Sequence, residues 1–213
     1  MSDMIKKQYI DCVYKILETE GLQAISIRRI AKEVGCNSAT LYRYFNDVEQ
    51  LICLTSIRYL EPYLKDIREA SKTIRNPIEL NQSLWKSFAT YAFHRPTIFE
   101  MLFFGQYKEN LMDFMYEYYD IYMDDFLDLD GFSITFLFNG SIFERNYMFY
   151  RRAVGMGYIT QDAAKLISEV EVYTFHGLLM ECKQNQYSTE ELNQKVLVFR
   201  QQMDQIIEKF ILK

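Results

Sequence analysis

The pattern of hydrophobic and polar positions predicts helices along the whole chain. Residues 3–20 carry apolar residues at helical spacing, and Gly21 follows directly after them. The apolar positions of this stretch are Ile10, Val13, Ile16 and Leu17. A second and shorter stretch repeats the spacing i, i+3, i+4 and i+7 with Ile27, Ile30, Ala31 and Val34. We expect each stretch to bury one helical face.

Polar residues and glycine mark the ends of several short helices between residues 26 and 51. Ser26 is a typical N-cap for the second helix, and Gly35 permits the left-handed turn that ends it. Asn37 is a candidate cap for a third, very short helix with Leu41 and Phe45 on its apolar side. Asp47, with Gln50 three residues later, resembles a capping box that opens a fourth helix.

Two short helices joined by a turn that contains glycine form the helix-turn-helix pattern. The second of them is too short to be stable alone in water, so neighbouring helices must hold it. Its polar side carries hydroxyls, phenols and one guanidinium, which are donors that reach phosphate oxygens or base edges. These residues are Ser38, Thr40, Tyr42, Arg43 and Tyr44. The alternative is that they form a solvated face of a small helical bundle.

Helix boundaries recur through the rest of the chain. Asn76, Pro77 and Glu79 together form an N-terminal signal for a helix that runs toward His94. Pro96 opens a short helix that ends near Gly105. Further helices are expected over 107–128, about 133–155, from Thr160 to about Asn185, and from Ser188 onward. The sequence therefore predicts an all-α fold of some nine helices, without an internal repeat.

Composition and charge narrow the class of protein. The chain has 213 residues and a net charge of −5, and its four cysteines form no CxxC pair. The charge is uneven: residues 1–58 hold eight Lys and Arg against seven Asp and Glu, whereas the remainder holds 16 against 22. No apolar run approaches the roughly 20 residues that span a bilayer. We expect a cytoplasmic protein without a membrane segment, metal site or cofactor.

The helix-turn-helix stretch resembles the DNA-binding domain of the TetR family of bacterial repressors. The run ATLYRYF is close to the most typical string of that family, and the resemblance spans residues 5 to about 55. The matching residues are Ser26, Arg28, Ile30, Ala31, Gly35, Thr40, Leu41, Tyr42, Tyr44, Phe45, Glu49 and Leu51. The resemblance implies a three-helix DNA-binding head over residues 1–55 and a larger helical body, for effector binding and dimerisation, over residues 56–213.

The resemblance also implies which residues of the head meet DNA. Ser26, Arg28, Thr40, Tyr42 and Tyr44 would lie against the backbone or groove of the duplex. Sequence choice would rest on Asn37, Ser38, Ala39 and Arg43. Val48 stands where the family often has a Lys, and Asp47 adds a carboxylate near the phosphates. We therefore expect modest, salt-sensitive binding with fewer phosphate contacts than a basic relative makes.

The last two helices carry apolar seams that suggest a homodimer. The final helix repeats spacings of 4 and 3 in a heptad seam formed by Leu192, Val196, Phe199, Met203, Ile206 and Phe210. The preceding helix has a similar side that includes Leu166, Val170 and Gly177. Both seams are expected to pack against a second copy as a four-helix bundle. The alternative is that both face the core of the body.

The middle of the chain is rich in aromatic residues and acids. Residues 91–150 hold 19 Phe and Tyr, and residues 109–144 hold nine acids and neither Lys nor Arg. A cavity for a small apolar or aromatic effector is one interpretation, and a simple core is the other. The acids Asp113, Glu117, Asp120, Asp124 and Asp128 form one stripe, which we expect to be a solvated surface. The candidate ligand-binding residues are Trp85, Phe88, Phe103, Tyr107, Phe114, Tyr118, Tyr122, Asp125, Asn139, Phe143 and Tyr147.

The sequence thus favours a ligand-responsive transcriptional regulator. The expected partners are a palindromic operator in double-stranded DNA, a small-molecule effector and a second copy of the chain. Release from the operator on effector binding would make it a repressor, and an activator of the same fold is an alternative. A helical adaptor acting through protein contacts is another, because the charge of the head is weak. An enzyme is disfavoured, since no nucleophile–base pair, metal-ligand cluster or phosphate loop is visible.

Overall fold

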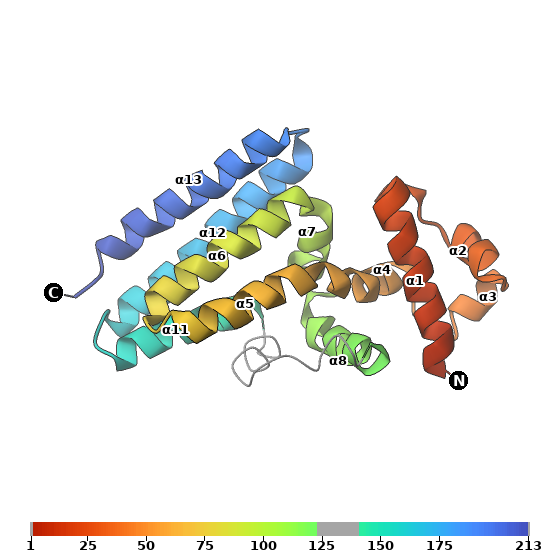
Figure 1. The fold of residues 1–213 in the computed structure, drawn as a ribbon, viewed down its shortest axis with the longest axis horizontal. Coiled ribbons are helices and arrows are strands. Elements are labelled where there is room, and N and C mark those ends of the chain that lie inside the picture. Colours follow the sequence, from red (N-terminus) through yellow and green to blue (C-terminus); the bar gives the residue numbers. More distant parts are fainter. Residues whose placement is uncertain (1, 123–140, 213) are drawn as a thin grey trace. The chain divides into compact units, whose positions relative to one another are not determined.

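The structure, a computed structural model, describes residues 2–122 and 141–212. These residues form helices and contain no strand, as an all-α fold requires (Figure 1). Their backbone contacts divide them into two compact units. The first unit holds residues up to 60 together with those from 110 to 122, and the second holds the remaining described residues.

The first unit is built on a long N-terminal helix. Its elements are α1 (Ser2–Glu20), η1 (Leu22–Ala24), α2 (Ile27–Val34), α3 (Ser38–Leu41), α4 (Val48–Ser56), η2 (Ile57–Leu60) and α8 (Leu111–Ile121). Helix α1 packs against α2, α4 and α8. The fully buried side chains include Tyr9, Ile10, Val13, Ile30, Leu41 and Leu51. The apolar faces predicted for α1 and α2 are therefore the faces that meet in this core.

Helix α8 belongs to the first unit although it is distant from the head in sequence. It packs on α1, α4 and η2 through a buried face that includes Phe114, Met115 and Tyr118. Polar contacts with α1 reinforce the packing. Glu117 forms an ion pair with Lys6, and the Tyr122 hydroxyl donates to Asp11 at 2.7 Å. The first compact unit therefore ends at residue 60, and the chain enters it again at residue 110. The functional boundary expected after residue 55 stays a prediction.

The second unit surrounds a central helix. Its elements are α5 (Glu61–Thr73), α6 (Pro77–His94), α7 (Pro96–Phe104), α11 (Ile142–Gly155), α12 (Gln161–Gln184) and α13 (Thr189–Glu208), and η3 (Lys108–Asn110) lies in the link to α8. Helix α6 packs against all five of the others. In Figure 1, α6, α12 and α13 run alongside one another.

Most predicted helix ends of the second unit are where their caps place them. The Asn76 side chain accepts from the backbone of Ile78 at 2.9 Å, with Pro77 as the first residue of α6. Thr160 caps α12, and Ser188 with Glu191 forms a capping box on α13. Sequence inspection missed one such box, in which Ser141 and Glu144 open α11.

Two expected helices differ from their predicted limits. The helix expected from residue 107 begins at Leu111, because a 3-10 turn occupies Lys108–Asn110. The helix expected over about 133–155 is α11, which begins at Ile142 in the described part. The remainder of both predicted ranges lies outside the described residues. Among the residues that the structure does describe, no helix is both long and apolar enough to cross a bilayer.

Candidate nucleic-acid interface

The chain between α2 and α3 folds through local interactions that the sequence encodes directly. Ser26 is extended, and its hydroxyl accepts from the backbone N–H of Arg29 at 3.3 Å. Gly35 ends α2 with φ of 76° and ψ of 31°, a left-handed conformation that favours glycine. The Asn37 side chain then accepts from the backbone N–H of Ala39 at 2.6 Å and opens α3. The predicted caps and turn are confirmed.

Two apolar residues and a tyrosine of α1 hold the short helix α3 in place. Leu41 and Phe45 are buried, and the Phe45 ring meets Tyr9 edge-on with centroids 5.9 Å apart. The Tyr9 hydroxyl is hydrogen-bonded to the Cys36 thiol at 2.9 Å, which ties the turn to α1. These contacts supply the tertiary support that a single helical turn needs.

The polar side of α3 faces away from this core. Tyr42 is 55 % exposed and Arg43 is exposed, whereas Thr40 and Tyr44 are half-buried. Asn37 and Ala39 are exposed, and Ser38 is half-buried. Ser26 and Arg28, at the start of α2, are also exposed. The structure thus gathers all nine predicted DNA-binding residues at α2, α3 and the segment that follows α3, and none of them is buried.

Arg29 has a structural role that sequence inspection missed. Its guanidinium forms an ion pair with Glu20 at the end of α1, lies 3.8 Å from Glu33, and donates to the carbonyl of Ala24. The hydrogen bond with Glu20 raises the pKa of Arg29 and lowers that of Glu20. Of the two neighbouring arginines, Arg28 is therefore the one that α2 presents to solvent.

Asp47, whose carboxylate was expected to lie near the phosphates, is hydrogen-bonded at the start of α4. Asp47 accepts from the backbone N–H of Gln50 at 2.7 Å, which confirms the cap. The second bond of the predicted box differs, because the Gln50 side chain accepts from the backbone of Asn46 and not of Asp47. The Asp47 carboxylate is thus held on backbone donors at the positive end of α4.

The candidate ligand residues do not gather in one place. Trp85, Phe88 and Phe103 lie in the core of the second unit, where Phe88 meets Phe103 edge-on at 5.0 Å. The α8 residues Phe114, Tyr118 and Tyr122 belong to the first unit, and Tyr107 is half-buried in the link before η3. Phe143 and Tyr147 line a surface groove described below. Asp125 and Asn139 lie outside the described residues.

The acid stripe and the two histidines have ordinary surroundings where they are described. Asp113 and Asp120 are exposed, as expected, but Glu117 is half-buried against Lys6. Asp124 and Asp128 lie outside the described residues. The His94 ring is exposed at the end of α6, 2.8 Å from the carbonyl of Thr90. The His176 ring stacks on Phe104, and burial lowers its pKa.

A buried polar network links three helices of the second unit, and sequence inspection did not predict it. The side-chain oxygen of Asn146 on α11 accepts from Asn81 at 2.6 Å and from the Trp85 indole at 2.9 Å, both on α6. The Asn146 amide donates to the Glu171 carboxyl and to the backbone of Ser168 on α12, each at 2.9 Å. The spacing of Asn81 with Trp85, on one helical face, was the available signal.

The Glu171 carboxyl is the most perturbed acid of this network. Burial raises its pKa to about 8 from an ordinary value of 4.5, although hydrogen bonds from Asn146 oppose the shift. Its second oxygen, Oε1, has no hydrogen-bond partner among the described residues. Burial likewise raises the pKa of the Tyr150 hydroxyl, which donates to Asn81. Near neutral pH Glu171 is therefore mostly an uncharged acid.

The residues of the predicted α13 seam differ in burial. Val196, Phe199 and Met203 are buried by their own chain, and Phe199 is only 1 % exposed. Ile206 and Phe210 pack against the core formed by α6, α11 and α12. Val196, Phe199 and Met203 thus face the body's own core, whereas Ile206 and Phe210 keep partial exposure, and a dimer contact on α13 stays a prediction. Leu192, at the start of the seam, is half-buried.

The seam predicted on α12 stays accessible. Leu166 is 48 % exposed, Val170 is half-buried, and Gly177 is exposed with open space where a side chain would be. Tyr173, which falls on the same side of the helix, is 65 % exposed. An apolar stripe formed by Leu166, Val170, Tyr173 and Gly177 therefore lies on the outer side of α12.

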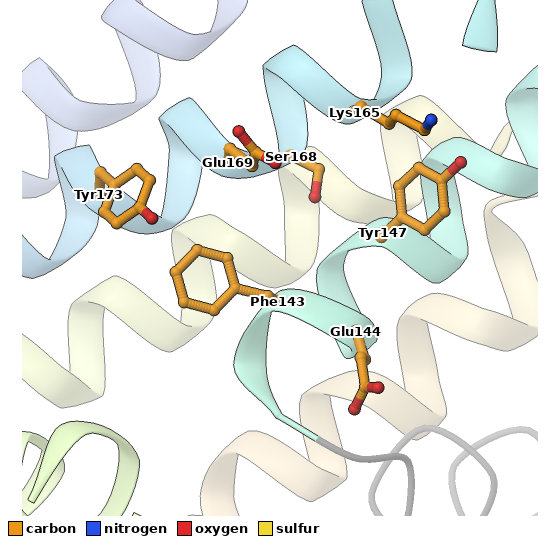
Figure 2. A pocket seen from close by; sticks show the side chains of 7 residues that line it. All are labelled: Phe143, Glu144, Tyr147, Lys165, Ser168, Glu169 and Tyr173. Atoms are coloured by element: carbon orange, nitrogen blue, oxygen red, sulfur yellow. The ribbon is translucent and has the colours of Figure 1, made fainter. Parts of the chain in front are cut away.

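A groove lined in part by aromatic side chains lies between α11 and α12. It encloses about 450 Å³ and is lined by Phe143, Glu144, Tyr147, Lys165, Ser168, Glu169 and Tyr173 (Figure 2). A second groove, of about 360 Å³, lies between α5 and α6 and is lined mainly by polar residues, with Asp66 accepting from the hydroxyls of Ser87 and Tyr91. The described residues hold no cluster of His, Cys, Asp and Glu that could bind a metal.

Comparison with known proteins places the head in a family. Residues 14–52 match the family of bacterial regulatory proteins named for TetR. Over 124 residues the chain is 25 % identical to an HTH-type transcriptional regulator of Staphylococcus aureus (strain bovine RF122 / ET3-1), and the match covers 54 % of this chain and 65 % of the relative. A regulator of the same kind from strain MRSA252 is 24 % identical over 121 residues, with the same coverage. The chain thus spans less than two thirds of the length of these curated relatives.

Solved structures extend the likeness to the fold of the whole chain. A TetR transcription regulator from Haloarcula marismortui has a TM-score of 0.57 at 14 % identity, over 98 % of both chains. The regulator PfmR from Thermus thermophilus has a TM-score of 0.52 at 16 % identity, over 94 % of this chain and 97 % of its own. At such identities the likeness concerns the fold alone. Residues 14–52 thus match the TetR family of bacterial regulatory proteins, and the chain as a whole resembles solved TetR regulators in fold.

Proposed function

We propose that the protein is a DNA-binding transcriptional regulator whose first unit reads a duplex through α3. The observation that carries the proposal is the separation of two sides in α3 and in the segment 42–45 that follows it. Leu41 and Phe45 anchor the helix, and Tyr42 and Arg43 project into solvent. A recognition helix of the helix-turn-helix type enters the major groove with such a side.

The exposed residues divide into two kinds of DNA contact. Ser26 and Arg28 at the start of α2, with the hydroxyls of Thr40, Tyr42 and Tyr44, suit phosphate oxygens and fix the register. Asn37, Ser38, Ala39 and Arg43 are the positions that would meet base edges, and Arg43 is suited to a guanine. The exposed cations between Ser26 and Phe45 are Arg28, Lys32 and Arg43, so binding should be salt-sensitive, with a smaller salt slope than that of a more basic relative.

The apolar stripe on α12 supports a homodimer. Leu166, Val170 and Gly177 form an apolar line on a helix whose opposite face is buried, and Gly177 leaves room for the close approach of a second helix. A two-fold pair would present two copies of α3 to a palindromic operator, with half-sites roughly 34–36 Å apart. In this proposal the protein acts in the cytoplasm, where its operator lies.

Regulation by a small effector completes the proposal. The effector binds the second unit and favours a form of the dimer that does not fit the operator, so the protein is a repressor released by its ligand. To reverse a population of 1:99, the effector needs about 5.5 kcal/mol of differential affinity between the two forms. Equal calorimetric affinity for the effector with and without operator DNA would contradict release.

Operator selection from random duplexes at low salt tests DNA binding. We expect enrichment of a palindrome, and we expect Arg43→Ala to weaken binding to it by roughly tenfold or more while relaxing the choice of base at one position of each half-site. Lys209→Ala, a surface cation at the end of α13, is the matched control and should bind as the wild type does. If no palindrome is enriched and Arg43→Ala behaves as the control does, the protein is a helical adaptor and not a DNA reader.

A further inference from the structure

The groove between α11 and α12 has the size and lining of a small-molecule site. Its volume of about 450 Å³ falls in the range of roughly 300–1,000 Å³ that ligand pockets occupy. Phe143 and Tyr147 enter it from α11 and Tyr173 from α12, so two helices supply its aromatic walls. The rings of Phe143 and Tyr173 meet at 62° with centroids 5.3 Å apart.

Polar and apolar side chains occupy different ends of the groove. Figure 2 shows Lys165 and Tyr147 at one end, Phe143 and Tyr173 at the other, and Ser168 between them. No hydrogen bond or ion pair in the described part of the chain engages the Lys165 ammonium or the Tyr147 hydroxyl. The Ser168 hydroxyl has no partner there either, although Ser168 is only 3 % exposed. Three donors that the fold does not use therefore line one hollow.

The two carboxylates of the groove differ in their engagement. Glu144 accepts from the backbone N–H of Ser141 at 2.8 Å as part of the capping box, so its charge is held at the start of α11. Glu169 stands one turn from Lys165 on α12, and the described residues give the two no ion pair within 4 Å. The free donors thus outnumber the free carboxylates.

We propose that this groove binds an aromatic carboxylate, with its ring system against Phe143, Tyr147 and Tyr173 and its anionic group at Lys165. A carboxylate is an acceptor that the Lys165 ammonium and the Tyr147 hydroxyl bind with charge-assisted hydrogen bonds. The rings provide the flat apolar contact, and Ser168 offers a further donor at mid-length. As the site of an effector, this assignment rests on the proposed regulatory function and specifies the class of its ligand.

The groove shares Ser168 with the buried polar network. The carbonyl of Ser168 accepts from the Asn146 amide, which donates to Glu171 as well. A ligand that moves Ser168 therefore acts on the hydrogen bonds that join α6, α11 and α12. Ser168 therefore belongs both to the groove lining and to the hydrogen-bonded core of the second unit.

Three bicyclic probes of nearly equal shape test the ligand class by calorimetry on the full chain. They are 2-naphthoate, naphthalene-2-carboxamide and 2-naphthylmethylammonium, which differ in charge. We expect 2-naphthoate to bind most tightly and the ammonium probe to bind least. Lys165→Gln should lower the affinity for 2-naphthoate by about tenfold and leave that for the carboxamide unchanged, since only the anion loses a charged partner. Lys209→Gln, outside the groove, is the matched control.

Several results would overturn the assignment. Tightest binding of the ammonium probe, reduced by Glu169→Gln, would make the groove a cation site. Equal effects of Lys165→Gln and Lys209→Gln would place the ligand elsewhere. If 2-naphthoate does not bind and Phe143→Ala converts a dimer into a monomer in sedimentation, the groove is covered by a second copy. Duplex binding by the ligand-free protein is measured separately, so failure of the ligand site and failure of the DNA-binding proposal are distinguishable.

Discussion

The region around α3 and the interior of the second unit place polar residues in opposite ways. Around α3 the apolar residues Leu41 and Phe45 are buried and the polar ones face solvent. In the second unit Asn146 and Glu171 are buried on a hydrogen-bond network, and Leu166 and Tyr173 face solvent. A buried carboxyl and an exposed apolar stripe both cost free energy in an isolated chain. The second unit therefore carries features beyond those that folding requires, whereas around α3 the buried residues Leu41 and Phe45 are apolar.

The largest expected effect is on the free energy of unfolding, and it distinguishes the buried side of α13 from its outer side. Phe199→Ala removes a buried ring that contacts Trp85 and Phe175, and it should lower the free energy of unfolding by about 3–5 kcal/mol. Leu197→Ala, on the outer side with 43 % exposure, should change it by less than about 0.5 kcal/mol. Urea denaturation of both variants measures the difference. Equal costs would mean that α13 buries its outer side as well, as in a dimer built on this helix.

An intermediate effect concerns the buried carboxyl. The folded pKa of Glu171, about 8, lies above its ordinary value of 4.5, so the folded state binds the extra proton between these limits. Stability is then greatest below about pH 4.5 for this group and falls by up to about 1.4 kcal/mol per pH unit as the pH rises toward 8. Glu171→Gln keeps an uncharged side chain and should remove this slope.

The comparison is made by denaturation at a series of pH values. Glu169→Gln, an exposed acid on the same helix, is the control and should leave the slope as it is in the wild type. Tyr150 on α11 and Asp204 on α13 also act on Glu171, so their own titration is followed in parallel. An unchanged slope in Glu171→Gln would show that the carboxyl is ionised in the folded protein at neutral pH.

The smallest expected effect lies in the head. Asn37→Ala removes the cap of α3 and should cost about 1 kcal/mol of local stability, seen as faster hydrogen exchange of the Ala39 amide. Gln23→Ala, an exposed residue of η1, should leave this exchange unchanged. Global unfolding should shift little in either variant. A change in the second unit would contradict the division of the chain into separate compact units.

Local signals account for what the sequence predicted well. Ser26, Gly35, Asn37 and Asp47 each act within three residues of their own position, so the limits of α2, α3 and α4 follow from short segments alone. The same holds for the caps of α6, α12 and α13. The exposed polar side chains around α3 follow too, because a single helical turn with two anchors leaves few choices for its outer side. Ser26 and Arg28 were added by the family resemblance, and the DNA contacts of all these residues stay a prediction.

What the sequence did not predict depends on partners distant in the chain. The α13 seam has a spacing that suits a second copy or its own core equally, and only its packing on α6 shows which of its residues face the core. The network of Asn146 joins residues 61 and 65 positions apart. Glu117 was expected in a solvated stripe, but Lys6 lies 111 positions away and pairs with it. The hydrophobic periodicity of a sequence does not show which residues far apart in the chain come into contact.

The separation of anchors from reading positions on α3 bears on how such a protein diverges. Leu41 and Phe45 hold the helix, while residues 38, 39 and 43 contribute little to its burial. Substitutions at those three positions can accumulate after gene duplication without loss of folding, since they leave the interior untouched. A new target preference is thus within reach of a few neutral steps, and descendants of one ancestor can come to control different genes with the same scaffold.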